Sequence, residues 1–174
     1  LISPFNHPLA IPVGKMVPAL LFGNAVMWTP ASPGSPIARI TAECFASASG
    51  CPEILPVLFG NNDVAHNVME VCDAVTISGS LQAGYAAQEI CSRRHVPLQA
   101  ELGGNNASIV WSDADLAEAA AAIVEGAFAF AGQRCTANRR VVVEATIYDA
   151  LMEKLIAATG MISWGDPRDE NTQV

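Results

Sequence analysis

The sequence is poor in positive charge. Nine Lys and Arg stand against seventeen Asp and Glu, a formal net charge of −8, and the only basic pairs are Arg93–Arg94 and Arg139–Arg140. Nucleic acids and anionic membrane surfaces are recognised through concentrated positive charge. We therefore expect no nucleic-acid partner. No apolar run free of charge and proline is long enough to cross a bilayer, so no membrane association is expected either.

Cysteine and histidine are also scarce and scattered. The five cysteines are odd in number and form no C-x-x-C pair, and the three histidines share no spacing pattern with them. This distribution predicts neither a disulfide framework nor a metal site, and it favours a reducing, cytoplasmic compartment.

What is present is a globular composition. The 174 residues are 51% hydrophobic and 15% charged, which is enough for one core or for parts of two. The chain opens at Leu1–Ser3 like the end of a strand and stops at 165–174 in a loop. We therefore expect a fragment of a longer chain.

Predicted strands and helices alternate along the sequence. Apolar runs bounded by Gly, Pro and Ser predict strands at 1–3, 25–28, 57–59, 74–77, 98–102, 107–111 and 140–143. Helical spacing predicts helices at 9–22, 36–48, 64–71, from the 78–84 turn to 92, from Asp113 or Asp115 to 130, and at 146–158. Ser35 is predicted as the N-cap of the second of these, with Pro36 as its first residue. The class is α/β, with right-handed βαβ units on a parallel sheet. A domain boundary is expected after Gly103–Gly104.

One cysteine stands apart from the rest. The Ala-rich run ends at Gly132, and Cys135 follows in a polar loop with Gln133, Arg134 and Thr136. Nucleophilic cysteines need partial exposure and polar or cationic surroundings. A buried, unreactive thiol is the common alternative, and the loop alone leaves both interpretations open.

Three further places could carry chemistry. The G-x-x-x-x-G turn from Gly79 to Gly84 joins a strand to a helix, where backbone N–H groups favour an anion, although a plain tight turn has the same form. Glu101 ends a strand and is either a general base or a solvent-facing carboxylate. Asn6, between Pro4 and Pro8, is either an oxyanion donor or a turn residue.

Taken together, these segments resemble the aldehyde dehydrogenase superfamily over nearly the whole chain. Four motifs occur in the family's order and spacing: S-P-F-N-H-P at 3–8, S-G-S-L-Q-A-G at 78–84, E-L-G-G-N-N at 101–106 and G-Q-R-C-T at 132–136. The resemblance implies a partial Rossmann-like cofactor domain over 1–103 and the start of an α/β catalytic domain over 104–174. The G-G-N-N and A-G-Q-R-C-T wording is similar to the branch that oxidises amino-acid-derived semialdehydes, such as succinylglutamate semialdehyde.

The resemblance also implies a role for each motif residue. Cys135 would attack the aldehyde, the Asn6 amide and the Cys135 backbone N–H would hold the oxyanion, and Glu101 would activate water to hydrolyse the thioester. The residues expected at an NAD or NADP cofactor are Trp28, Thr29, Ser32, Gly79, Ser80, Gly84, Leu102 and Gly103.

The chain departs from the family pattern at the adenosine side of the cofactor. Thr29-Pro-Ala-Ser32 stands where the family usually has Lys-Pro-Ser-Glu, so no carboxylate repels a 2′-phosphate. The preference for NAD or NADP is therefore open. Leu81 replaces a common Thr and Asn105 a common Lys.

Two other functions remain open at this stage. One is a cysteine-dependent acyl-transfer enzyme or esterase that uses Cys135, Asn6 and Glu101 without hydride transfer. The other is a non-catalytic nucleotide-binding subunit. For the intact protein we expect a homo-oligomer, a dimer or tetramer. For the 174 residues alone we expect weak turnover and self-association, because strands 107–111 and 140–143 would have exposed edges.

Overall fold

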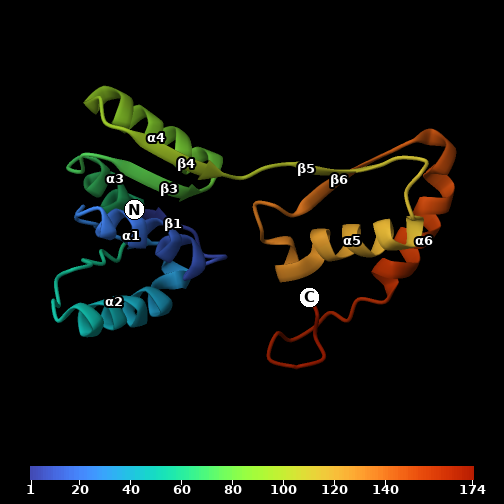
Figure 1. The fold of residues 1–174 in the computed structure, drawn as a ribbon, viewed down its shortest axis with the longest axis horizontal. Helices are drawn as coiled ribbons and strands as arrows, with labels where there is room; N and C mark the ends of the chain where they lie inside the picture. Colours follow the sequence, from blue (N-terminus) through green and yellow to red (C-terminus); the bar gives the residue numbers. More distant parts are fainter. The chain divides into compact units, whose positions relative to one another are not determined.

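A computed structural model describes all residues from 1 to 174 (Figure 1). The chain divides into two compact units, Leu1–Gly103 and Gly104–Val174. None of the helices combines the length and the apolar character needed to cross a membrane.

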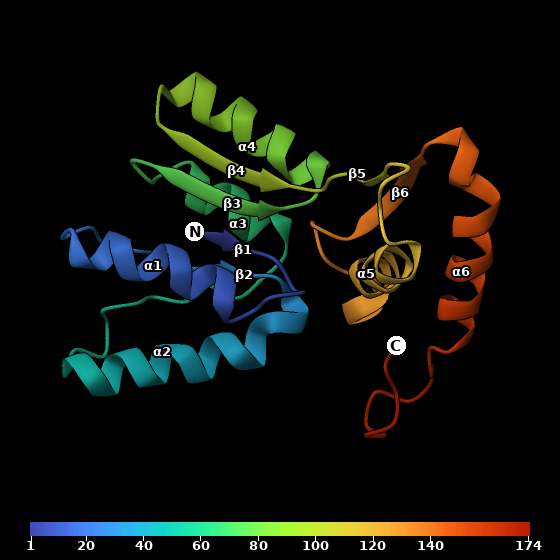
Figure 2. The same cartoon turned by 45° about the vertical axis from the view of Figure 1, so that its right-hand side comes forward.

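The first unit is built on a four-stranded parallel sheet. Its order is β2 (Thr29–Pro30), β1 (Ile2–Ser3), β3 (Val75–Gly79) and β4 (Leu98–Leu102). β3 and β4 pair along their whole lengths, from Val75 opposite Leu98 to Gly79 opposite Leu102. Figure 2 shows the arrowheads of β3 and β4 pointing the same way, so the carboxyl ends of the strands share one edge.

Two helices cover each face of this sheet. α1 (Ala10–Leu21) leads from β1 to β2, whereas α4 (Leu81–Arg94) leads from β3 to β4 in the opposite direction across the sheet. Right-handed crossovers therefore put α1 and α4 on opposite faces, as Figure 2 shows. α2 (Ser35–Ser49) shares the face of α1, and α3 (Asn62–Met69) shares that of α4. One core contains Leu1, Met16, Val26, Trp28, Ala38 and Leu55, and the other contains Met69, Val75, Ile77, Ala87, Ile90 and Cys91.

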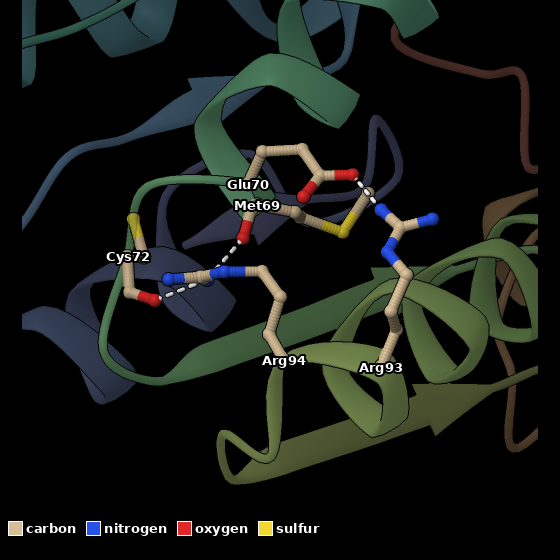
Figure 3. A network of polar contacts seen from close by, with 5 residues as sticks. All are labelled: Met69, Glu70, Cys72, Arg93 and Arg94. Atoms are coloured by element: carbon tan, nitrogen blue, oxygen red, sulfur yellow. Dashed lines mark hydrogen bonds and ion pairs between the residues drawn. The ribbon is translucent and has the colours of Figure 1, made fainter.

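Polar contacts join α3 to α4 on their shared face (Figure 3). The Arg94 guanidinium donates to the carbonyls of Met69, at 2.7 Å, and Cys72, at 2.5 Å, just where α3 has ended. Arg93 forms an ion pair with Glu70 beside it. A cation on the last carbonyls of a helix complements its dipole, so Arg94 both ends α3 and ties it to α4.

Several predicted elements of the first unit need correction. Residues 25–28 form no strand, because only Trp28 makes a bridge, to Val57. β2 begins instead at Thr29, where the sequence predicts no strand. Residues 57–59 are likewise reduced to that one bridge. α2 begins at Ser35 itself, after Gly34, so Ser35 is not its N-cap. The segments around Trp28 and Val57 are joined by a few backbone hydrogen bonds, such as that from the Leu58 N–H to the Trp28 carbonyl at 2.8 Å, and not by a full strand pairing.

The second unit contains a two-stranded parallel sheet and two helices. β5 (Asn106–Val110) pairs with β6 (Asn138–Val143), and α5 (Leu116–Phe128) connects them, followed by α6 (Tyr148–Gly160). Val110, Ala120, Ile123 and Leu151 form its core. Of the two carboxylates that could begin α5, Asp115 does so, because its Oδ1 accepts the backbone N–H groups of Ala117 and Glu118. α5 ends at Phe128, two residues earlier than predicted.

The β5–β6 pair leaves apolar side chains uncovered. Val110 is buried, but Ile109 is 75% exposed and Val142 52% exposed. Neighbouring side chains of a strand point to opposite faces, so the face of β5 away from Val110 has no cover within this unit. Because the sheet has only these two strands, each also has one unpaired edge, as expected from the sequence.

Candidate active site

The residues predicted in the first unit meet at one edge of its sheet. Asn6 follows β1 and Ser32 follows β2, whereas Gly79 ends β3, Ser80 comes directly after it, and Glu101 lies near the end of β4. The crossovers after the adjacent strands β1 and β3 run to opposite sides of the sheet, which makes this point the topological switch of the sheet. Asn6 and Gly79–Ser80 therefore flank the position where open α/β sheets bind ligands.

The start of α4 has the features of an anion site. β3 runs through Gly79, and Ser80 is the N-cap of α4, its Oγ accepting the Ala83 N–H at 3.2 Å. The remaining backbone N–H groups of the first turn and the helix dipole favour a negative group there.

Gly84 has a separate, structural reason to be glycine. It is buried, and a Cβ built on it would lie 2.5 Å from Cδ1 of Leu102. The close approach of α4 to the end of β4 depends on this missing side chain. The predicted contact of Gly84 with a cofactor stays a prediction.

The residues predicted at the adenosine side differ sharply in exposure. Trp28 is completely buried, and its Nε1–H donates to Oγ of Ser3 at 2.8 Å. Thr29 is 3% exposed, and its Oγ1 is buried without any hydrogen-bond partner. Ser32 is exposed. A buried hydroxyl without a partner is uncommon in native structures, so the Thr29 hydroxyl has an unmet capacity to bind a ligand or water.

The remaining predicted residues of this unit lie at its surface. Asn6 is half-buried in the bend between β1 and α1. Glu101 and Gly103 are exposed, and Leu102 is half-buried against α4. The Glu101 carboxylate is thus accessible to water, as either interpretation of its role requires.

Cys135 lies in a turn of the second unit, between a short 3₁₀ helix (Ala129–Gly132) and β6. Cys135 is exposed in this unit. Three consecutive residues before the turn have left-handed backbone angles: Phe130 with φ 58°, Ala131 with φ 54° and Gly132 with φ 66°. Non-glycine residues in this region are strained, and such strain gathers at functional sites.

Side chains from three directions hold this turn in place. Asn106, at the start of β5, donates through Nδ2 to the carbonyls of Cys135, at 2.6 Å, and Ala137, at 3.2 Å. Arg139 donates to the Gly132 carbonyl at 2.8 Å. Arg134 reaches back to the Glu125 carbonyl near the end of α5, at 3.3 Å. The nearest cation to Cys135 in sequence is therefore engaged with a helix end.

Sequence reasoning missed Asn106 and Arg139. In the sequence, Asn106 is the last residue of the E-L-G-G-N-N motif, and no role was predicted for its side chain. Arg139 is the extra residue of a bulge, because β5 pairs Asn106 with Asn138 and Ala107 with Arg140. A bulge that re-aims a side chain depends on strand register, which no local pattern specifies.

The predicted residues thus fall into two groups. Asn6, Ser32, Gly79, Ser80 and Glu101 share the carboxyl edge of one sheet, and Cys135 belongs to the other unit. Joint action of Cys135 with Asn6 and Glu101 stays a prediction. No group of three or more His, Cys, Asp or Glu side chains converges in a way that could hold a metal ion.

Comparison with known proteins identifies the family. The family model described as "Aldehyde dehydrogenase family" matches residues 1–174. The chain belongs to the aldehyde dehydrogenase family. It is 39% identical over 173 residues to the alpha-ketoglutaric semialdehyde dehydrogenase of Bacillus subtilis (strain 168), covering 98% of this chain and 36% of that protein.

Solved structures of the family share the fold. The NAD-dependent aldehyde dehydrogenase from Sinorhizobium meliloti aligns with a TM-score of 0.92 and 34% identity, over 99% of this chain and 35% of that one. The NADP-dependent glyceraldehyde-3-phosphate dehydrogenase from Bacillus halodurans C-125, complexed with NADP, aligns with a TM-score of 0.93 and 35% identity, over 99% of this chain and 36% of that one. This aldehyde dehydrogenase family chain therefore spans about a third of the length of these relatives. Both the α/β class and the family resemblance inferred from the motifs are confirmed.

Proposed function

We propose that the protein containing this chain oxidises an aldehyde to a carboxylate with NAD or NADP, through a covalent intermediate on Cys135. The observation that carries the proposal is Cys135 itself, an exposed thiol at the tip of a strained and braced turn in an aldehyde dehydrogenase family chain. A thiol held outward in this way is accessible to a carbonyl carbon.

In the proposed first step, the Cys135 sulfur adds to the aldehyde carbonyl carbon and gives a thiohemiacetal. Charge develops on the former carbonyl oxygen during this addition. The side-chain amide of Asn6 and the backbone N–H of Cys135 would donate to that oxygen, which stabilises the transition state more than the ground state.

The residues at the carboxyl edge of the first unit fit a dinucleotide. The N-terminus of α4 after Gly79 and Ser80 suits the pyrophosphate, and the orphaned Thr29 hydroxyl suits a ribose oxygen. When bound, the oxidised nicotinamide would supply the hydride acceptor, and loss of hydride from the thiohemiacetal carbon would leave a thioester on Cys135. Since no carboxylate lies between Thr29 and Ser32, we propose that both NAD and NADP are accepted.

In the proposed last step, Glu101 takes a proton from a water molecule, which attacks the Cys135 thioester. The carboxylic acid leaves, and the thiol is restored. A thioester is a good acyl donor to water, and the exposed Glu101 carboxylate is free to bind that water.

The substrate we propose is a semialdehyde, an aldehyde that carries its own carboxylate. The support is the semialdehyde dehydrogenase from Bacillus subtilis and the wording of the Asn105–Asn106 and Cys135 motifs. We also propose a homo-oligomer in the cytoplasm, a dimer or tetramer. Its support is the uncovered apolar face of β5 and β6, which favours association.

Replacement of the nucleophile tests the proposed function. In the natural full-length protein, Cys135→Ala should abolish formation of reduced nicotinamide from an aldehyde while cofactor affinity stays nearly unchanged. The matched control is Cys44→Ala. Cys44 is also exposed but lies in the first unit, and this variant should retain activity. Oxidation by Cys135→Ala at the natural rate would refute the assignment. Ester hydrolysis without any cofactor-dependent oxidation would instead identify an acyl-transfer enzyme.

A further inference from the structure

The turn that carries Cys135 is held at its far side by a single carboxamide. Asn106 Nδ2 donates to the Cys135 carbonyl at 2.6 Å and to the Ala137 carbonyl at 3.2 Å, across 29 and 31 residues of sequence. The two N–H groups of one amide thus fix the carbonyls of the residues before and after Thr136. The turn's own backbone hydrogen bond runs from the Ala137 N–H to the Arg134 carbonyl.

Asn106 is itself well placed to act as a rigid support. It is half-buried as the first residue of β5, and Gly104 leaves room for it, since a Cβ there would lie 3.2 Å from Oδ1 of Asn106. Ala137 is completely buried, so the end of the turn is packed as well as hydrogen-bonded. On the other side, Arg139 holds the Gly132 carbonyl after the left-handed residues.

We propose that Asn106 is a positioning residue that holds the Cys135 peptide in the orientation needed for attack. The inference rests on the proposed function of Cys135 as nucleophile. The backbone N–H of Cys135, expected to hold the oxyanion, lies on the preceding peptide group and is joined to the anchored carbonyl through the Cys135 Cα. A rotation of this turn would therefore displace nucleophile and donor together. A misplacement of about 1 Å at a reacting group reduces rate by up to ~100-fold.

The test compares two substitutions one residue apart in the natural full-length protein. Asn106→Asp keeps the side-chain volume but removes both N–H donors. Asn105→Asp is the control, because it adds the same charge to the same segment. Asn105 is exposed, and its hydrogen bond from Arg140 is accepted by the backbone carbonyl, which the substitution keeps. We expect Asn106→Asp to slow the first turnover of reduced-cofactor formation about 10- to 100-fold relative to Asn105→Asp, with unchanged cofactor affinity.

Two further measurements separate positioning from general destabilisation. Amide hydrogen exchange in the 133–137 turn should accelerate about tenfold in Asn106→Asp, while exchange along 107–110 and 140–143 stays as in Asn105→Asp. The buried Cys91 thiol should remain protected from alkylation, which reports that the first unit is folded. If Asn106→Asp unfolds, the neutral Asn106→Ser variant, which retains one donor, is measured in the same way.

Each outcome decides the inference. Faster exchange in the turn together with a slower first turnover supports it. Faster exchange with an unchanged first turnover overturns it, and so does no change in either measurement. A slower first turnover that appears only when Cys91 becomes alkylated also overturns it, because the loss of rate then reflects unfolding. The proposed function fails separately: an active Cys135→Ala would refute the nucleophile, whereas the exchange measurement would still report whether Asn106 braces the turn.

Discussion

Replacement of Gly132 by alanine tests whether the left-handed entry to the Cys135 turn matters. Gly132 has φ 66°, and a Cβ there would lie 3.0 Å from the Ala127 carbonyl oxygen. Gly50, at the end of α2, has the same φ of 66° but nothing within 4 Å of its Cβ position. Both alanines therefore carry the left-handed penalty, and only Gly132→Ala also carries a contact with backbone.

The expected magnitudes follow from these two terms. A left-handed L-residue costs ~1–2 kcal/mol, so Gly50→Ala should lower the free energy of local opening at the end of α2 by about that amount. A backbone carbonyl cannot swing aside as a side-chain end can, and overpacking of this kind adds ~1–3 kcal/mol. Gly132→Ala should therefore lose about 2–5 kcal/mol of local stability.

Peptide-resolved hydrogen exchange measures local opening around each glycine, and reduced-nicotinamide formation measures activity. We expect Gly132→Ala to lose both protection in 127–137 and activity, and Gly50→Ala to lose only protection near residue 50. Equal losses of protection at the two sites would show that the Ala127 contact has no cost. Full activity in a destabilised Gly132→Ala would show that this entry does not orient Cys135.

Three further predictions concern single side chains. Glu101→Gln should slow steady turnover ~10²–10⁴-fold but keep a first-turnover burst of reduced cofactor, and loss of the burst with normal steady turnover would contradict its role as base. Ser32→Glu should shift the kcat/KM ratio toward NAD by repulsion of the 2′-phosphate, so an unmoved ratio would argue against this site. The pKa of Asp115 is lowered by hydrogen bonds from the backbone N–H groups of Glu118 and Ala117. The ionised cap therefore stabilises α5 fully at pH values above the ordinary Asp pKa, and this stabilisation is lost as the pH falls through the lowered pKa. Asp115→Asn, which caps without titrating, should remove that part of the acid dependence of exchange in α5.

Much of the fold was predictable because its signals are local. The strand at 98–102 was predicted with its observed bounds, and the helix at 9–22 to within one residue at each end. Both are specified by apolar spacing between Gly and Pro punctuation. Local signals placed Cys135 in a polar turn after the apolar helix, but they left its exposure open. The parallel sheet followed from the alternation of elements.

What the sequence alone could not determine depends on pairs of residues far apart in the chain. The failed strand at 25–28 has ample apolar character, but only Trp28 finds a partner, and its indole is fixed by Ser3, 25 residues earlier. The left-handed Phe130 and Ala131 violate local preference and persist because the surrounding structure holds them. Asn106 supports Cys135 across 29 residues. Local propensity thus determined most of the helices and the longer strands. Strand pairing and long-range hydrogen bonds, which exist only after the chain has folded, decided which short apolar segments become strands and how the candidate nucleophile is held.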